Sequence, residues 1–269
     1  MSDARTASVG GAGADDWNAH WASYADKNDL NPAQTYRRHL IMSALGLGTA
    51  PAPVRLVELG CGHGDFARDV LRAHPTIGFV GIDRAETGVA IARKNVPGGV
   101  FEQGDLTLAE TLPARYRGYA THAVCTEVLE HIDDPLLALR TARSLFAPGC
   151  RLVVTVPAGP MSAFDRHIGH RRHFSAEQLE SLLAQAGLEV ESASGAGFPF
   201  FNLYRLAVVA RGDALIRDAG QDHGQHLPLH ARAVIRTFAT LFRFNRDGGR
   251  RGWQLVAVAR EPGSVEARS

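Results

Sequence analysis

The sequence predicts an α/β protein built on a doubly wound, mostly parallel sheet of seven strands. From residue 54 to about residue 194, short apolar runs alternate with helical patterns, the order expected of a parallel sheet with helices on both faces. The first apolar run leads through a glycine-rich turn directly into an amphipathic helix, and later runs end next to acidic residues. Ligands bind at the carboxyl ends of the strands in such sheets, so we expect a ligand site there.

Composition limits the classes of partner. A chain of 269 residues, 45% hydrophobic and 21% charged, can bury one core with a small cap. A net charge of +1 gives no general argument for a nucleic acid or a membrane as partner. Cys61, Cys125 and Cys150 fall in or beside predicted strands without metal-type spacing, so we interpret them as core residues in a reducing cytoplasm. No apolar run reaches the roughly 18 to 20 residues that a membrane span needs.

Two predicted segments precede the sheet. Residues 1–14 are small, polar and rich in glycine, which indicates a frayed tail. Residues 15–50 read as a helical cap, in which a helix bearing Trp17 and Trp21 is followed by a turn and a second helix over residues 33–47. The two tryptophans either pack on the core or cover a substrate, so both are candidates for substrate binding.

The glycine-rich turn is the first candidate binding site of the predicted core, residues 51–194. A strand over residues 54–58 precedes it, and a helix over residues 65–74 follows. The spacing departs from the dinucleotide pattern Gly-x-Gly-x-x-Gly, because Asp65 stands where the third glycine would fall, and this argues against a nicotinamide dehydrogenase. An acid before the turn suits a cationic ligand. The cofactor candidates here are Glu58, Gly60, Cys61, Gly62 and Gly64.

This turn resembles the first motif of the class I S-adenosylmethionine-dependent methyltransferases, in which the ammonium and sulfonium of the cofactor lie over the glycines. The next strand, residues 78–82, ends at Asp83, where a carboxylate can accept hydrogen bonds from ribose hydroxyls. The alternative for Asp83 is an N-cap of the helix over residues 85–95. Arg84 would stack on the nucleoside or face solvent.

A third strand, residues 99–103, precedes Gly104-Asp105-Leu106. The carboxylate of Asp105 would accept a hydrogen bond from the adenine amino group, and Leu106 would lie on the ring. The same sequence of glycine, aspartate and an apolar residue recurs at this place in the methyltransferases that the turn resembles. These three residues are therefore further cofactor candidates.

Acids and a histidine follow the fourth predicted strand, residues 120–126. Glu127, Glu130 and His131 come directly after it, at the edge of the sheet where the transfer site is expected, and Thr126 ends it. Thr126 and Glu127 are cofactor candidates, and Glu127 and Glu130 are catalytic candidates. Because imidazole titrates near neutrality, His131 and the more distant His170 are candidates for taking a proton from the acceptor. Structural roles in their loops remain the alternative for both histidines.

Arginine and histidine are dense between residues 166 and 173, after a fifth strand over residues 150–156. A capping box at Ser175 then opens a helix to Ala186, and a sixth strand is expected over residues 188–193. The basic side chains of this loop would bind a carboxylate or phosphate on the substrate or face solvent. The substrate-binding candidates in this loop are Arg166, His167, Arg171 and Arg172.

Residues 195–251 interrupt the alternation and read as an insertion that forms a wall or lid. The insertion contains an aromatic run with Phe198 and Tyr204, a polar loop with His223, His226 and His230, and a basic helix over residues 229–244. Phe198 and Tyr204 are substrate-binding candidates, with core packing as the alternative. The last strand is expected over residues 252–259, within a final segment, 252–269, that then frays.

Residues 54–194 together resemble the Rossmann-like core of the class I methyltransferases, in particular the ubiquinone-type and small-molecule branch. The segment Asn31-Pro32-x-x-x-Tyr36-Arg37-Arg38 resembles the one that precedes the core in that branch, where an arginine holds the cofactor carboxylate. The resemblance therefore implies that Tyr36 and Arg37, together with Arg38, belong to the cofactor site.

A second resemblance concerns a metal. Glu127-x-x-Glu130-His131 with the distal His170 resembles the set that holds a divalent cation in small-RNA ribose methyltransferases. Such a set implies Mg²⁺ or Mn²⁺ bound by Glu127, Glu130, His131 and His170. The Glu-His pair also occurs in metal-free relatives, so the metal remains open.

The sequence thus predicts an S-adenosylmethionine-dependent methyltransferase that methylates a small molecule, on a hydroxyl or acidic group. The alternatives are a metal-dependent RNA ribose methyltransferase and a non-catalytic cofactor-binding protein. The near-neutral charge argues against nucleic acid as the substrate. The acceptor, the pathway and the oligomeric state are not predicted.

Overall fold

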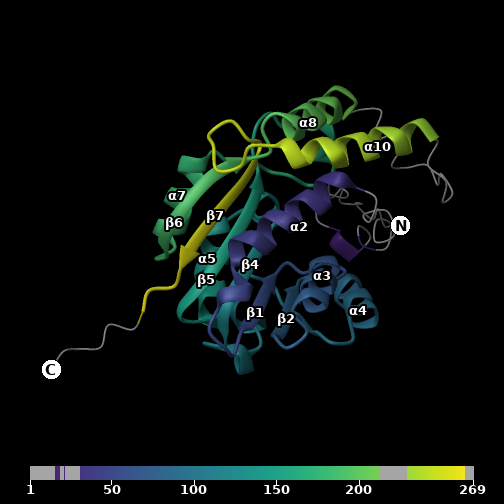
Figure 1. The fold of residues 1–269 in the computed structure, drawn as a ribbon. Helices are drawn as coiled ribbons and strands as arrows, with labels where there is room; N and C mark the ends of the chain where they lie inside the picture. The colour runs from purple at the N-terminus through teal and green to yellow at the C-terminus, as the bar shows by residue number, and fades with distance from the viewer. Residues whose placement is uncertain (1–15, 19–20, 22–30, 213–228, 264–269) are drawn as a thin grey trace, which may run out of the picture.

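The computed structural model describes residues 16–18, 21, 31–212 and 229–263 (Figure 1). The predicted tail, residues 1–14, and the loop histidines His223 and His226 lie outside the described residues, as does the side chain of His230. The described part contains one seven-stranded sheet with the order β3-β2-β1-β4-β5-β7-β6. Strands β1 to β5 are parallel, and β7 runs antiparallel between β5 and β6. The predicted doubly wound α/β fold is confirmed.

The strands lie close to their predicted positions. Their bounds are β1 Arg55–Leu59, β2 Gly78–Asp83, β3 Val100–Gln103, β4 Ala120–Thr126, β5 Phe146–Pro157, β6 Glu189–Ala196 and β7 Gln254–Arg260. The main difference is β5, which begins four residues before the predicted start at residue 150. Its first pairing, Ala120 with Phe146, precedes a register shift that leads to the regular ladder from His122 and Arg151 onward. Periodicity alone does not reveal such an irregular strand start.

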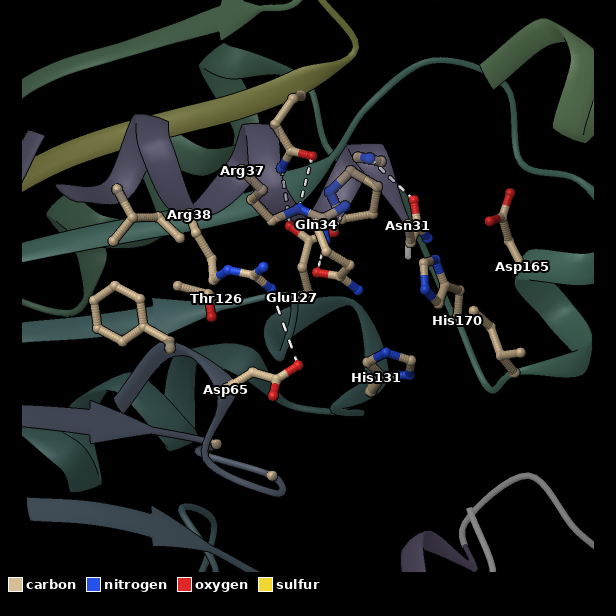
Figure 2. Close-up of a pocket in the computed structure, with 18 of the residues that line it drawn as sticks. Asn31, Gln34, Arg37, Arg38, Asp65, Thr126, Glu127, His131, Asp165 and His170 are labelled. Atoms are coloured by element: carbon tan, nitrogen blue, oxygen red, sulfur yellow. Dashed lines mark hydrogen bonds and ion pairs between the residues drawn. The ribbon is translucent and has the colours of Figure 1, made fainter. Parts of the chain in front are cut away.

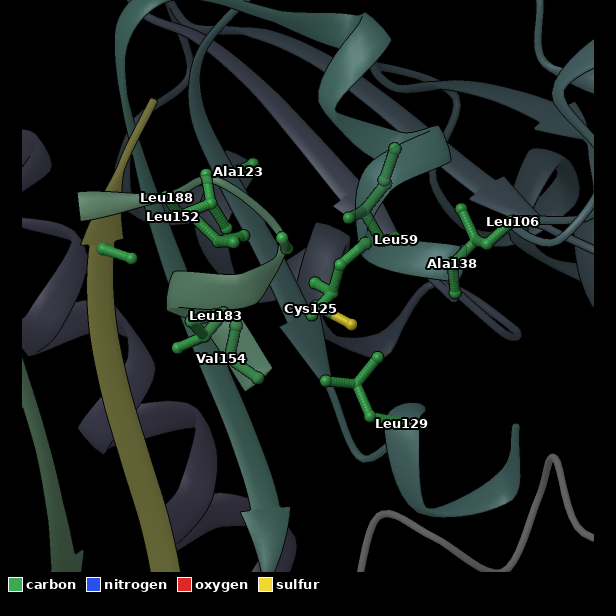
Figure 3. Close-up of a cluster of buried hydrophobic side chains, with 14 of the residues drawn as sticks. Leu59, Leu106, Ala123, Cys125, Leu129, Ala138, Leu152, Val154, Leu183 and Leu188 are labelled. Carbon is green, nitrogen blue, oxygen red and sulfur yellow. The ribbon is translucent and has the colours of Figure 1, made fainter. Parts of the chain in front are cut away.

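Helices cover both faces of the sheet. On one face, α2 (Pro32–Leu45), α3 (Asp65–Ala73) and α4 (Glu86–Asn95) bury Ile41, Phe66 and Val89 against the strands. On the other face, α5 (Pro135–Ala142) and α7 (Ala176–Gln185) pack against strand residues such as Leu59, Leu152 and Val154 (Figure 3). Neighbouring strand residues point to opposite faces, so the central strands are apolar throughout, as parallel strands covered on both sides require.

A third apolar cluster joins α2 to the predicted insertion. Tyr36 of α2 packs its ring 5.6 Å from that of Phe201 in α8 (Phe200–Ala210) and 5.3 Å from that of Phe242. Helix α10 (Leu229–Leu241) ends beside Phe242 and crosses near α8 (Figure 1). The aromatic contacts hold α8 and α10 at the end of the sheet where β5 ends. None of the described helices is long and apolar enough to cross a membrane.

Candidate active site

A cavity of about 460 Å³ opens at the carboxyl ends of β1 and β4, beneath α2, α8 and the short helix α6 (Ala163–His167) (Figure 2). The sequence candidates that line it are Trp17, Trp21, Arg37, Arg38, Glu58, Gly60, Cys61, Gly62, Thr126, Glu127, His131, His170 and Tyr204. The candidates outside its lining are Tyr36, Gly64, Asp83, Arg84, Gly104, Asp105, Leu106, Glu130, Arg166, His167, Arg171, Arg172 and Phe198. One cavity thus joins the glycine turn to both candidate histidines.

The glycine turn requires residues without a Cβ. Gly60 and Gly62 have φ values of 77° and 50°. A Cβ at Gly60 would lie 2.3 Å from Cγ2 of Val128, and one at Gly62 would lie 2.4 Å from the ring of Trp21. Both the backbone conformation and the close contacts therefore exclude larger residues.

Glu58 presents an uncompensated polar atom to this turn. The residue is only 3% exposed, and its Oε2 has no hydrogen-bond partner among the described residues. Burial, together with the charges of Asp83 and Asp65, raises the pKa of Glu58 well above its usual range. A cationic group in the cavity would stabilise the charged carboxylate, so this site fits the ammonium of S-adenosylmethionine.

Asp83 supports the turn from β2. Its Oδ2 accepts a hydrogen bond from the amide of Gly62, and its Oδ1 accepts one from the amide of Ala85, each at 2.8 Å. The N-cap residue of α4 is Ala85, so Asp83 does not cap the helix. Each carboxylate oxygen has a second lone pair, which leaves Asp83 able to accept from ribose hydroxyls.

The residues predicted to contact adenine all have partners or neighbours within the protein. Asp105 accepts two hydrogen bonds from Thr107 through Oδ1, at 2.8 Å from the amide and 2.6 Å from the hydroxyl. Leu106 is 7% exposed and belongs to the core below the sheet edge. The carbonyl oxygen of Arg84 accepts a hydrogen bond from the side chain of Gln103. The roles of these residues toward adenine stay predictions.

Arg37 and Glu127 form an ion pair in the middle of the cavity wall. Nη2 of Arg37 lies 3.1 Å from Oε2 of Glu127, while Nε and Nη1 donate to Gln254 and Gln34. Oε1 of Glu127 also accepts from Gln254 and Thr155. Glu127 has φ of 55°, a conformation rare outside glycine, and residues held this way often mark functional sites.

Tyr36 and Arg38, which were predicted to belong to the cofactor site with Arg37, point in different directions. Tyr36 points into the aromatic cluster and its hydroxyl donates to Asp247, away from the cavity. Burial is the first cause that raises the pKa of this phenol. Arg38 does line the cavity and pairs with Asp69 at 2.7 Å.

Glu130, His131 and His170 form a compact cluster of possible metal ligands. One ligand atom from each lies within 4.8 Å of the others, and the rings of the two histidines are 4.6 Å apart (Figure 2). Glu130 is fully buried, and neither of its carboxylate oxygens has a hydrogen-bond partner among the described residues. Burial and the nearby Glu127 raise its pKa well above the usual range. Glu127, predicted as a fourth metal ligand, is bound to Arg37 and is not part of this cluster.

The protonation of His170 follows from its neighbours. His173 Nδ1 lies 3.0 Å from the carbonyl oxygen of Gly159, which can only accept, so this nitrogen carries a proton. In neutral His173, Nε2 must then accept from His170 Nδ1, 3.3 Å away. His170 Nε2 is left without a proton. Burial, and then the charge of His131, lowers the pKa of His170 to about 3, which keeps the ring neutral.

The four basic candidates of the loop do not line the cavity. Arg166 and His167 are exposed on α6. Arg171 donates from Nε to the carbonyl oxygen of His131 at 2.6 Å and pairs with Asp133, while Arg172 donates to the carbonyl oxygen of Asp133. Arg171 and Arg172 thus join the loop to the segment after β4 and keep His170 opposite His131.

The aromatic candidates separate into two groups. The ring of Trp17 lies 4.6 Å from that of His131, and the ring of Trp21 lies 4.8 Å from that of His63, so both reach the cavity from the N-terminal segment. Tyr204 also lines the cavity and donates to Asn31. Phe198 lies outside, under the guanidinium of Arg251.

Several polar lining residues were not predicted: Asn31, Gln34, His63, Asp165, Arg205 and Gln254. Arg205 is the one cation in the apolar helix α8, which is a signal that sequence reading could have used. Asp165 is 1% exposed and accepts from the backbone and hydroxyl of Ser162 and from Arg205. Gln254 begins the last strand, and only tertiary structure brings it to Arg37 and Glu127.

The sheet order and the glycine turn define a class I S-adenosylmethionine-dependent fold. A family described as a methyltransferase domain matches residues 33–193. The chain belongs to this family, and the protein is an S-adenosylmethionine-dependent methyltransferase.

Individual relatives agree with the family. The chain is 26% identical over 207 residues to a ubiquinone biosynthesis O-methyltransferase of Xanthomonas axonopodis pv. citri, covering 71% of this chain and 84% of the relative. It is 25% identical over 208 residues to the protein of the same name from Pseudomonas aeruginosa, covering 71% and 86%.

Solved structures share the fold at low sequence identity. Phosphoethanolamine N-methyltransferase 2 of Haemonchus contortus, in complex with S-adenosyl-L-methionine, has a TM-score of 0.60 at 14% identity over 91% of this chain and 57% of its own. A methyltransferase of Thermotoga maritima, described as a possible histamine N-methyltransferase, has a TM-score of 0.56 at 20% identity over 91% and 98%. These likenesses concern the fold alone.

Proposed function

We propose that this protein transfers a methyl group from S-adenosylmethionine to a hydroxyl oxygen of a small molecule and that Mg²⁺ or Mn²⁺ assists the reaction. The observation that carries the proposal is the carboxylate of Glu130. It is fully buried, has no hydrogen-bond partner among the described residues and lies against His131 and His170. A bound cation would stabilise the ionised form of this carboxyl group, which is otherwise costly in a buried position.

The glycine side of the cavity would hold the cofactor. Glu58 would face its ammonium, Arg37 its carboxylate and Asp83 its ribose, while Gly60 and Gly62 let it approach the backbone. The cofactor supplies an electrophilic methyl group on a sulfonium. Since the displacement needs little covalent help, the main task of these residues is positioning, which can contribute roughly 7 to 11 kcal/mol.

A hydroxyl acceptor must lose its proton during transfer. Glu130, His131 and His170 would hold the cation, which would lower the pKa of a hydroxyl bound beside it. Two imidazoles with one carboxylate suit Mn²⁺ better than Mg²⁺, which prefers oxygen ligands. The unprotonated Nε2 of His170 has the form that a metal ligand requires, whereas a pKa of about 3 makes the ring a weak general base.

The names of the relatives support oxygen as the atom methylated, because the two similar proteins described above are O-methyltransferases of ubiquinone biosynthesis. These relatives span most of the chain, including the segment that carries the Glu-His pair and His170.

The test is transfer of labelled methyl from S-adenosylmethionine into separated fractions of a cell extract, with and without a chelator. We expect label in small molecules, loss of transfer with the chelator and recovery with Mn²⁺ or Mg²⁺. Glu130→Gln should reproduce the chelator effect, whereas Glu177→Gln, an exposed carboxylate on α7, should not.

The other outcomes separate the alternatives. If the chelator does not change the rate of transfer, the reaction does not use a cation, and His131 and His170 remain as candidates for the general base. Label confined to RNA would replace the small-molecule acceptor with an RNA. Cofactor binding without label in any fraction would contradict catalysis and favour a binding protein.

A further inference from the structure

The cavity contains three arginines, and two of them have partners on every guanidinium nitrogen. Arg37 contacts Gln254, Gln34 and Glu127 through Nε, Nη1 and Nη2. Arg38 contacts Asp69, Asp65 and Thr35 through Nε, Nη1 and Nη2, at 2.7, 4.0 and 3.5 Å. Arg38 therefore has little capacity for an anion of the acceptor, and Arg37 is the proposed contact of the cofactor carboxylate.

Arg205 differs from both. Its Nη2 donates to Asp165, at 3.1 Å from Oδ1 and 2.9 Å from Oδ2, and the described residues provide no hydrogen bond to its Nε or Nη1. Its side chain is 15% exposed and lines the cavity, so the unused N–H groups are within reach of a bound molecule. Nε–H and the N–H groups of Nη1 point to different sides of the guanidinium, so each can donate its own charge-assisted hydrogen bond to an oxygen of a carboxylate or phosphate.

The surroundings hold this guanidinium in place. Asp165 is 1% exposed, and its Oδ2 also accepts from the amide and hydroxyl of Ser162, each at 2.8 Å. Burial acts to raise the pKa of Asp165, but the hydrogen bond and charge of Arg205 together with hydrogen bonds from Ser162 outweigh burial, and the pKa lies below its usual range. The carboxylate therefore stays charged and anchors one corner of Arg205.

Arg205 is also at the right end of the cavity for the acceptor. Its partner Asp165 lies beside His170, on the side away from the glycine turn (Figure 2). Phe164, Ile168 and Val208, which are neighbours of Asp165 and Arg205 in or next to α6 and α8, also line the cavity, and their apolar surface strengthens a charge-assisted hydrogen bond.

We propose that Arg205 binds a carboxylate or phosphate of the methyl acceptor and thereby selects acidic small molecules. This inference rests on the proposed small-molecule methylation and names its substrate class. It replaces Arg166, Arg171 and Arg172 as the anion contact, because those side chains lie outside the cavity lining.

The first experiment measures anion binding without knowledge of the acceptor. The protein loaded with S-adenosylhomocysteine is titrated calorimetrically with benzoate and, separately, with inorganic phosphate. We expect one of them to bind saturably and Arg205→Gln to weaken it about tenfold or more, since charge-assisted hydrogen bonds are lost. The anion that binds decides between carboxylate and phosphate. Equal binding of both anions by wild type and variant, or no binding by wild type, would overturn the inference.

Two further variants guard against a general loss of structure. Arg205→Lys keeps the charge and can still pair with Asp165, but it has one nitrogen in place of three, so it should fold and still weaken anion binding several-fold. Arg143→Gln breaks a two-point ion pair with Glu261, which is not among the lining residues, and should leave anion binding unchanged. If Arg143→Gln and Arg205→Gln reduce the anion affinity equally, the loss in Arg205→Gln comes from a general change of structure and not from a lost contact between Arg205 and the anion.

The second experiment separates this inference from the proposed function. Labelled products from the extract assay are passed over an anion exchanger, and transfer is compared between wild type and Arg205→Gln. Labelled products that the exchanger retains, together with a KM for the acceptor raised about tenfold in Arg205→Gln, would support both the methyl transfer and the role of Arg205. Neutral products formed equally by both proteins would overturn the role of Arg205 and leave methyl transfer intact. Arg205-dependent anion binding without any labelled product would overturn methyl transfer alone.

Discussion

The glycine turn, residues 58–64, and the histidine loop, residues 159–173, face the same cavity but are held by different forces. Backbone hydrogen bonds hold the turn: the amides of Gly60 and Cys61 both donate to the carbonyl oxygen of Ile82, at 2.7 and 3.1 Å. In the loop, side chains add to the backbone hydrogen bonds, because Arg171 and Arg172 also donate to carbonyl oxygens beyond β4. The turn is therefore held by the neighbouring strand, and the loop by its own backbone and by side-chain contacts with the segment after β4.

This difference matters for catalysis. A cofactor used in every turnover needs a rigid cradle, which backbone geometry provides. An acceptor site needs side-chain chemistry that can vary, and loops on a rigid scaffold provide that. The comparison predicts that changes at the turn affect cofactor binding and changes at the loop affect transfer.

The largest effect should come from Asp83→Ala. The carboxylate holds the amides of Gly62 and Ala85, and it is the proposed acceptor for the ribose, so its loss removes the support of the turn and two charge-assisted hydrogen bonds. We expect the affinity for S-adenosylhomocysteine, measured by calorimetry, to fall about a thousandfold.

Asp105→Ala is the control, because it removes a carboxylate at the next strand end without touching the turn, and it should cost far less affinity. Near-normal affinity of Asp83→Ala for S-adenosylhomocysteine would contradict the proposed difference between turn and loop. The turn would then not depend on Asp83, and the cofactor would not be bound by this residue.

The turn could be predicted from sequence because its signal is local. Glycines at alternate positions directly after a strand indicate a positive φ and a close approach, and both are found at Gly60 and Gly62. The position of Asp83 could be predicted for the same reason. The end of the strand next to β1 can be placed from the alternation of strands and helices alone.

The acceptor side could be predicted only in part. His131 and His170 are 39 positions apart, yet a resemblance in motif brought them together. The pairing of Asp165 with Arg205 depends on where α8 packs, and that follows from aromatic contacts between Phe201, Tyr36 and Phe242 rather than from any local pattern.

Charge density alone did not decide the role of the basic residues in the histidine loop. Arg171 and Arg172 were expected either to bind an anion of the substrate or to face solvent, and carbonyl oxygens after β4 accept hydrogen bonds from both. Tyr36 was expected at the cofactor, but it lies on the face of α2 that meets α8. In each case a tertiary neighbour decided the direction of a side chain.

His170→Ala should have the next largest effect and sharpen the comparison. The ring lines the cavity with Nε2 free of a proton, and the cluster with Glu130 and His131 is incomplete without it. We expect the rate of methyl transfer at saturating cofactor to fall about a hundredfold, because a ligand of the proposed cation is lost. Affinity for S-adenosylhomocysteine should stay within about twofold of wild type, since the glycine turn is intact.

The control is His39→Ala, an exposed histidine of α2, which should change neither quantity. An unchanged rate in His170→Ala would return this residue to a structural role. A large loss of cofactor affinity would show that the loop and the turn are not independent.

The smallest effect is expected from Ser175→Ala, at the end of the histidine loop. Ser175 caps α7: its hydroxyl accepts from the amide of Gln178 at 3.2 Å, and the side chain of Gln178 accepts from the amide of Ser175 at 2.8 Å. Loss of such a cap should lower the free energy of unfolding by about 1 kcal/mol, measured by chemical denaturation. Ser181→Ala, in the middle of the same helix, should be nearly neutral.

The rate of methyl transfer in Ser175→Ala tests what positions His170. The amide of His170 donates to the carbonyl oxygen of Asp165, and the amide of Arg171 donates to that of Glu130, at 2.9 and 2.8 Å, so the loop is fixed before the chain reaches the cap. We therefore expect the transfer rate to stay within about twofold of wild type. A rate that falls as far as in His170→Ala would mean that the start of α7, and not the contacts with Asp165 and Glu130, holds the histidine in the cavity.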